Sequence, residues 1–221
     1  MTKHAQPCGI QLPRPGNWAD QPPELKERAR YLLLDTIGTA LAGRSADATL
    51  QVRTLMPRGA ASPLEAALLL GTACQALDLD ETNLPARCHI AAAVVPALIG
   101  AAMTGGCGGA RFMEALLAAY AFEARLGQAL APRHGARGWH PSATLGVFGA
   151  AYGASLLMGL DEEPMRHALV IASTQAGGVR AVFGGTAKPF NLGRAAQSGL
   201  TAALLARSGM TAPGDPFLSP V

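Results

Sequence analysis

Residues 143–157, ATLGVFGAAYGASLL, decide the fold class of this chain. The segment is apolar and rich in small side chains, and Gly146, Gly149 and Gly153 fall on one face of a helix. Glycines on one face let a neighbouring helix approach closely, whereas a buried strand favours β-branched and aromatic residues. The segment therefore predicts a buried helix that packs against other helices.

The composition of the whole chain indicates the same fold class. Of the 221 residues, 49% are hydrophobic but only 5% are aromatic, so Ala, Leu and Val make up most of the apolar mass. Such side chains suit closely packed helices, and no alternating apolar–polar run is long enough to form a sheet. We predict an all-α helical bundle, large enough for one domain or for two small ones.

Helical periodicity, capping residues and stop signals place the individual helices. Ser62 and Glu65 read as a capping box around Pro63, and Pro96 predicts a bend in its helix. The expected helices cover residues 24–41, 48–56, 63–77, 90–103, 111–130, 143–157, 162–176 and 192–207, with Asp161 as the cap of the seventh.

The distribution of proline suggests a division of the chain into three parts. Residues 1–22 read as an extended lead-in, residues 23–210 as an all-helical domain, and residues 211–221 as a proline-rich tail. The tail resembles the start of a linker, so a second domain is expected to be missing after it.

The charge of the chain favours a small anionic ligand. The net charge is +3 at pH 7, and the Lys and Arg residues are scattered along the sequence. Because there is neither a basic run nor an aromatic ladder, nucleic acid is not an expected partner. A slight positive excess suits an anionic small molecule.

The cysteines and the apolar runs bear on location. Cys8, Cys74, Cys88 and Cys107 form no CxxC pair, so they signal neither a zinc nor an iron–sulfur site and read as reduced thiols of a cytoplasmic protein. The first residues, MTKHAQPCGI, are too polar for a signal peptide. The longest apolar run, residues 90–103, is too short to cross a bilayer, so no membrane partner is expected.

Polar residues gather in three irregular segments of a chain that is only 15% charged. These segments, residues 78–89, 138–142 and 184–189, each lie at the end of an expected helix. Loops on a rigid scaffold are where functional residues concentrate. The three segments are therefore the candidates for a functional site.

The acid-rich segment allows two interpretations. Asp78, Asp80 and Glu81 are three acids within four residues, which suits either a metal site or a solvated helix cap. Asp78 and Thr82 are four residues apart, so both would lie on one face if the helix before them continued.

The other two segments also leave alternatives open. His140, held in a turn, suits an acid or base near neutral pH, or a histidine satisfied by hydrogen bonds at a helix start. Lys188, in a glycine-rich loop, suits either a surface charge or an ammonium that binds a carboxylate. His134 and His167 have weaker claims, since His167 lies within an expected helix, and His4 lies in the lead-in.

Three motifs together resemble the MmgE/PrpD family. Residues 75–82, QALDLDET, resemble its HxxDFDDT motif, and residues 138–146, GWHPSATLG, resemble its GFHPTATLG segment. Residues 185–196, GTAKPFNLGRAA, resemble its glycine-rich TK-loop leading into GRAA. The motifs occur in the family's order and spacing, and the resemblance extends over residues 24 to about 212.

The resemblance implies a fold and a reaction class. In this family an all-helical first domain is followed by a smaller α+β domain that closes over the pocket. Members are dehydratases, decarboxylases and epimerases of small di- and tricarboxylates, working without metal or organic cofactor. The chain is thus expected to be a cofactor-independent lyase or isomerase, with a repurposed role in a biosynthetic pathway as one option and a separate chain as a candidate source of the second domain. The alternative is a non-catalytic helical binding or subunit module. A homodimer is also expected, because the glycine- and alanine-rich helices leave apolar surface that pairing would cover.

The resemblance also assigns site residues by motif. It implies catalytic roles for His140, Lys188, Asp78 and His89, substrate binding by Thr82, Gln75, Lys188 and Asn191, and no metal ligand. Lysine and histidine would neutralise carboxylates, a histidine would move a proton, and Asp78 would orient a histidine or hold it protonated. Three residues depart from the family pattern: Gln75 replaces a histidine, Glu81 replaces an aspartate, and Asn191 stands where histidine is common.

Overall fold

The computed structural model describes residues 12–57 and 61–214. The expectations for His4 and Cys8 lie outside these residues, as do those for most of the lead-in and for residues 215–221 of the tail. The α-helices are α1 Pro23–Gly43, α2 Asp47–Arg53, α3 Pro63–Gln75, α4 Ala91–Ala102, α5 Gly109–Ala136, α6 Pro141–Met158, α7 Glu162–Ser173 and α8 Ala187–Arg207, with 3-10 turns at Trp18–Asp20 and Arg180–Val182.

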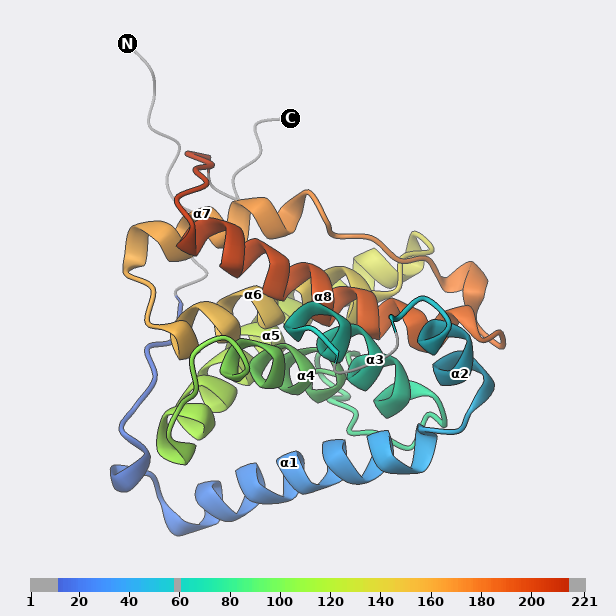
Figure 1. Cartoon of the computed structure of the whole chain (residues 1–221), viewed down its shortest axis with the longest axis horizontal. Helices are drawn as coiled ribbons and strands as arrows, with labels where there is room; N and C mark the ends of the chain where they lie inside the picture. Colours follow the sequence, from blue (N-terminus) through green and yellow to red (C-terminus); the bar gives the residue numbers. More distant parts are fainter. Residues whose placement is uncertain (1–11, 58–60, 215–221) are drawn as a thin grey trace.

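The predicted all-α class is confirmed. Within the described residues the only β pairing consists of two isolated bridges, Asn83 with Cys88 and Trp139 with Val179. Helix α6 lies in the middle of the bundle and contacts α4, α5, α7 and α8. Helix α1 runs along one edge of the molecule, α7 lies at the opposite edge, and α8 crosses between them in front of α6 (Figure 1).

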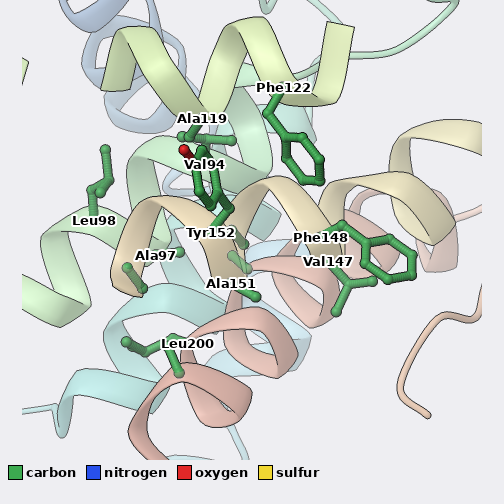
Figure 2. Close-up of a cluster of buried hydrophobic side chains, with 14 of the residues drawn as sticks. Val94, Ala97, Leu98, Ala119, Phe122, Val147, Phe148, Ala151, Tyr152 and Leu200 are labelled. Atoms are coloured by element: carbon green, nitrogen blue, oxygen red, sulfur yellow. The ribbon is translucent and has the colours of Figure 1, made fainter. Parts of the chain in front are cut away.

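The core surrounds α6, as its small side chains predict. Figure 2 shows Phe122 of α5, Leu98 of α4 and Leu200 of α8 around Tyr152 and Phe148 of α6. Close approach depends on missing side chains, since a Cβ on Gly199 of α8 would lie 2.6 Å from the Val147 carbonyl oxygen. Any larger residue at position 199 would push α8 away from α6.

The predicted capping box is confirmed, whereas the cap predicted for α7 is only positional. The Ser62 N–H donates to Glu65 Oε2 at 2.7 Å, and the Glu65 N–H donates to Ser62 Oγ at 3.3 Å. Asp161 occupies the N-cap position of α7 but its side chain accepts no capping hydrogen bond. No helix among the described residues is long and apolar enough to cross a membrane.

Helix α5 is longer than predicted. It continues to Ala136 instead of ending at Leu130. Contacts to α6 hold the added turns: His134 Nε2 lies 2.6 Å from Thr144 Oγ1, and the His134 ring stacks on Trp139. Tertiary contacts of this kind outweigh local helix propensity.

Helix α8 begins earlier than predicted. It starts at Ala187 instead of residue 192, because Pro189 falls in the first turn, where a missing N–H costs nothing. Lys188 and Asn191, which were expected in a glycine-rich loop, therefore lie on the first turns of a helix. This gives both side chains a rigid base.

Helix α1 presents part of its apolar pattern to solvent. Ile37 and Leu41 are 42% and 58% exposed, and Leu34 is 65% exposed. The residues that are buried on α1 are small, including Ala29 and Ala40. Helix α1 therefore keeps an apolar outer surface.

Three of the four cysteines lie among the described residues, and all three are free thiols. Cys74 and Cys88 are buried, and Cys107 is exposed. Burial raises the pKa of Cys74 to about 12. A thiol with so high a pKa is protonated and unreactive at neutral pH.

A fully buried carboxyl group, that of Glu123, lies between α5 and α6. Neither carboxyl oxygen has a hydrogen-bond partner among the described residues. The group fits only because position 149 is glycine, since a Cβ there would overlap it. Burial, reinforced by the charge of Glu81, raises the pKa of Glu123 well above its ordinary value, so the folded chain holds a neutral acid.

Glu123→Met is expected to raise the free energy of unfolding by about 1–3 kcal/mol at pH 7. Because the pKa of Glu123 is raised in the folded chain, its stability contribution falls as pH rises above its unfolded pKa. The gain should therefore be larger at pH 7 than at pH 4. Urea titrations at both pH values measure it, with the exposed Glu27→Met as control; equal gains at both pH values would contradict the argument.

Candidate active site

The acid-rich segment is a folded loop, not a continuation of α3. The helix ends at Gln75, and Asp78 has a left-handed φ of 56°, so the conditional expectation that Asp78 and Thr82 share a helix face is wrong. The Asn83 N–H donates to the Cys88 carbonyl at 2.9 Å, which folds the chain back on itself. The turn thereby returns His89 to the side of Asp78.

Glu81 and Tyr120 fix the base of this loop. The Tyr120 hydroxyl donates to Glu81 Oε1 at 2.6 Å and accepts from Asn83 Nδ2 at 3.1 Å. The other Glu81 oxygen accepts the Ala91 N–H at the start of α4, at 3.1 Å. The glutamate that departs from the family motif thus joins α4, α5 and the loop, and His89 lies between these anchored points.

Four charged side chains meet where the loop faces α8. Lys188 Nζ lies 2.7 Å from both oxygens of Asp78. His89 Nε2 lies 3.7 Å from Asp78 Oδ1, and His89 Nδ1 lies 3.3 Å from Asp80 Oδ2. Gln75 Nε2 donates to Asp78 Oδ1 at 2.5 Å. We refer to Asp78, Asp80, His89 and Lys188 as the charge network.

The charge network sets the protonation of its members. Burial favours a neutral His89 ring, but the carboxylates of Asp80 and Asp78 outweigh burial and raise the pKa of His89. Burial opposes ionisation of Asp78 as well, yet the ammonium of Lys188 lowers the pKa of Asp78. His89 therefore tends toward an imidazolium, and Asp78 is a carboxylate.

Asp80 is the member whose role the sequence did not reveal. It is only 6% exposed, and its oxygens accept no hydrogen bond of ordinary geometry from the described residues. The neighbouring His89 ring is then the positive charge that offsets a buried carboxylate. The motif resemblance assigned to Asp78 the task of holding a histidine protonated, and the closer carboxylate is that of Asp80.

His140 has the opposite electrostatic environment. It occupies the N-cap position of α6, is 3% exposed, and donates its backbone N–H to the Gly178 carbonyl at 3.0 Å. Its ring meets the edge of Phe183 at a centroid distance of 4.9 Å. Burial, together with the positive charges of Lys188 and His89, lowers the pKa of His140 to about 4. His140 is therefore neutral at pH 7.

Two residues expected to bind substrate instead contact the histidines. Thr82 Oγ1 lies 3.4 Å from His89 Nδ1, and Asn191 Nδ2 lies 3.3 Å from His140 Nδ1. Ser142, which the sequence reasoning left unassigned, accepts the His89 N–H at 3.0 Å and so ties the loop to α6.

A cavity of about 480 Å³ opens between these elements. Its volume lies in the range of small-molecule sites. His89, His140 and Lys188 lie in its wall. Asp78, Thr82 and Asn191 each contact one of these three residues, and Gln75 contacts Asp78. The lining residues are Arg87, His89, Ala131, Gly135, Ala136, His140, Pro141, Ser142, Arg180, Phe183 and Lys188.

Arg87, Arg180 and Phe183 belong to this wall and were missed by the sequence reasoning. Arg180 and Lys188 approach the Phe183 ring at 5.5 and 5.4 Å from its centroid. Arg87 has a left-handed φ of 54°, which is unusual for a residue with a side chain. Arg180 and Phe183 lie in the glycine-rich stretch before α8, and that position was the one available signal.

The side chains that could bind a metal do lie close together. Ligand atoms of Asp78, Asp80 and His89 all lie within 4.8 Å of one another. Lys188, however, already contacts both oxygens of Asp78. Two carboxylates face one ammonium and one imidazolium, so the charges balance without a further cation.

Comparison with known proteins finds one family model and several curated relatives that match this chain. The family model of the MmgE/PrpD N-terminal domain matches residues 16–220. The cis-aconitate decarboxylase-like protein oryM of Aspergillus oryzae is 35% identical over 216 residues, which is 86% of this chain and 44% of that protein. The cis-aconitate decarboxylase of Aspergillus terreus is 33% identical over 87% of this chain and 44% of its own length.

The human cis-aconitate decarboxylase is similar over a comparable region. It is 28% identical over 203 residues, which is 83% of this chain and 42% of that protein. The chain therefore spans less than half the length of the curated relatives that it matches.

Proposed function

The chain belongs to the MmgE/PrpD family, and from that premise we propose that it is a cofactor-independent lyase that decarboxylates a small tricarboxylate of the cis-aconitate type. The names of the relatives support this substrate class. The site residues proposed are His89, His140 and Lys188 in direct contact with the ligand, with Asp78 and Asp80 behind them.

One observation carries the proposal: the pKa values of the two histidines of a single cavity are shifted in opposite directions. The pKa of His89 is raised and that of His140 is lowered to about 4. Pairs of titratable groups whose environments separate their pKa values are typical of acid–base sites. Near neutral pH the wall thus offers an imidazolium, an ammonium and a neutral imidazole.

The chemistry that suits these groups is loss of CO2. The bond between carbon and a carboxylate breaks, CO2 leaves, and the electron pair spreads onto the neighbouring double bond and a remaining carboxylate. Lys188 stabilises the charge on that carboxylate. The carbon then takes a proton from the His89 imidazolium, and the neutral imidazole regains a proton from water.

Loss of CO2 is favoured over elimination or isomerisation, which stay open as alternatives. Those reactions begin by removing a proton from carbon, and this step needs a base in the wall. His89 is biased toward its protonated form, and Lys188 is engaged by Asp78. The neutral ring of His140 is the remaining candidate in the wall, and its pKa of about 4 makes it a weak base. Decarboxylation generates its electron pair without a base and then needs only an acid.

The test is to incubate the pure chain with cis-aconitate in heavy water and follow the mixture by NMR. We expect CO2 release with one solvent deuteron incorporated at one of the two carbons over which the electron pair spreads. Deuterium exchange without CO2 release would instead assign an isomerase. Binding without either reaction would support the alternative, a non-catalytic binding or subunit module.

The matched region covers less than half of each relative's length, so the family's second domain lies outside it. We propose that a separate chain carrying the family's second domain completes the cavity, so turnover that appears only on adding such a chain would support this arrangement.

The domain bounds of residues 23–210 and the homodimer also stay predictions. The exposed apolar face of α1, with Leu34 and Leu41, is available to a second copy, and sedimentation at micromolar concentration distinguishes dimer from monomer.

A further inference from the structure

The contact between Asn191 and His140 constrains which nitrogen of the His140 ring carries a proton. Asn191 Nδ2 lies 3.3 Å from His140 Nδ1, and both side chains are partly or fully buried. An amide nitrogen can donate a hydrogen bond but cannot accept one. The Nδ1 atom of His140 must therefore carry a lone pair in this contact.

The charge state of His140 makes this constraint decisive. Lys188, His89 and Arg180 place positive charge toward the ring, Asp78 places negative charge toward it, and Phe183 covers it. Burial and the positive groups keep the ring neutral near pH 7. A neutral imidazole carries one proton, so a ring that accepts at Nδ1 has its proton on Nε2.

We propose that Asn191 is a positioning residue that holds the proton of His140 on Nε2, so that His140 meets a ligand as a hydrogen-bond donor and not as a base. Nδ1 is engaged by Asn191, and Nε2 is the ring nitrogen left for the cavity. A donor at this point stabilises negative charge on a substrate oxygen. The mechanistic consequence rests on the proposed function, whereas the tautomer does not.

The location of Asn191 supports a fixed role. Asn191 and Lys188 are three residues apart on α8, so they lie on the same side of the helix. Asn191 also stands where the family commonly has histidine, a side chain that can donate, accept or titrate. An amide has no charge to gain or lose, so its preference for one tautomer persists over the working pH range.

The test reads the tautomer directly from the ¹⁵N chemical shifts of the His140 imidazole in the full chain. In the unmodified chain we expect Nε2 to be protonated and Nδ1 to be bare. In Asn191→Asp the carboxylate attracts a proton to Nδ1, so we expect the tautomer to switch and the pKa of His140 to rise by about 1–2 units. Asn17→Asp, which adds the same charge at an exposed N-cap, is the matched control.

A second variant keeps the test valid if Asn191→Asp does not fold. Asn191→Leu removes the donor without adding charge, and we expect both tautomers of His140 to be populated. A proton on Nδ1 in the unmodified chain, or a single unchanged tautomer in both variants, would overturn the proposal. The readout needs no turnover. An inactive chain with Nε2 protonated would therefore refute the proposed decarboxylase activity and leave the tautomer proposal standing.

Discussion

Lys188→Ala is expected to lower the rate of CO2 release from the proposed substrate, cis-aconitate, by about 100- to 1000-fold, which is the usual cost of removing one donor that stabilises developing charge. Lys188 lies in the cavity wall, and its ammonium is held by Asp78 at 2.7 Å. Rates measured at saturating substrate isolate this effect from weaker binding. Lys188→Arg should recover only part of the rate, because a planar fork does not replace a point charge.

The control is Lys26→Ala on α1, whose ammonium donates to the Ala19 carbonyl far along the chain from the site. Its rate should match that of the unmodified chain. The melting temperature of Lys188→Ala should change little, since its partner Asp78 is largely exposed and exposed ion pairs contribute little stability. A loss of less than about threefold in Lys188→Ala would remove lysine from the mechanism.

The second prediction concerns the proton donor. His89→Gln should lower the rate of CO2 release by about 100- to 10,000-fold, the range expected for loss of a positioned acid. Its imidazolium is stabilised by Asp80 and Asp78. The rate of the unmodified chain should be high below the raised pKa of His89 and should fall as pH rises through that pKa, because the active form is the protonated one.

The pH profile separates this role from a structural one. His89→Gln should lose the alkaline fall along with most of its activity. His167→Gln is the matched control, because Nδ1 of His167 contacts the backbone of Ala212 and not the cavity. A profile that rises with pH in the unmodified chain would indicate a histidine base and would contradict the assignment of His89 as the acid.

The fold class and most helices follow from the sequence, whereas two helix ends that border the site do not. The small residues of α6 indicate a helix that others approach closely, and the structure has such a helix. The extension of α5 depends on the contact of His134 with Thr144. This is a tertiary contact, which local sequence patterns do not predict. The early start of α8 is compatible with Pro189 in a first turn, but a compatible proline does not by itself fix where a helix begins.

The candidate site was predictable as a set of segments but not as a set of contacts. The three polar segments do meet, and Lys188 lies against Asp78 across 110 residues of sequence. Which acid holds His89 depends on the left-handed turn at Asp78, and sequence spacing alone does not give its direction. The tautomer of His140 depends on which atom of Asn191 faces it, so coordinates are needed to see it.

The ion pair between Lys188 and Asp78 makes ligand entry an exchange of partners. A simple monocarboxylic acid offers the ammonium the same charge that Asp78 already offers, and it also loses its own freedom of motion on binding. An acid with further carboxylates can displace Asp78 because Arg87 and Arg180 lie in the same wall. The proposed site would thus favour acids that carry several negative charges, before the shape of any one acid is recognised.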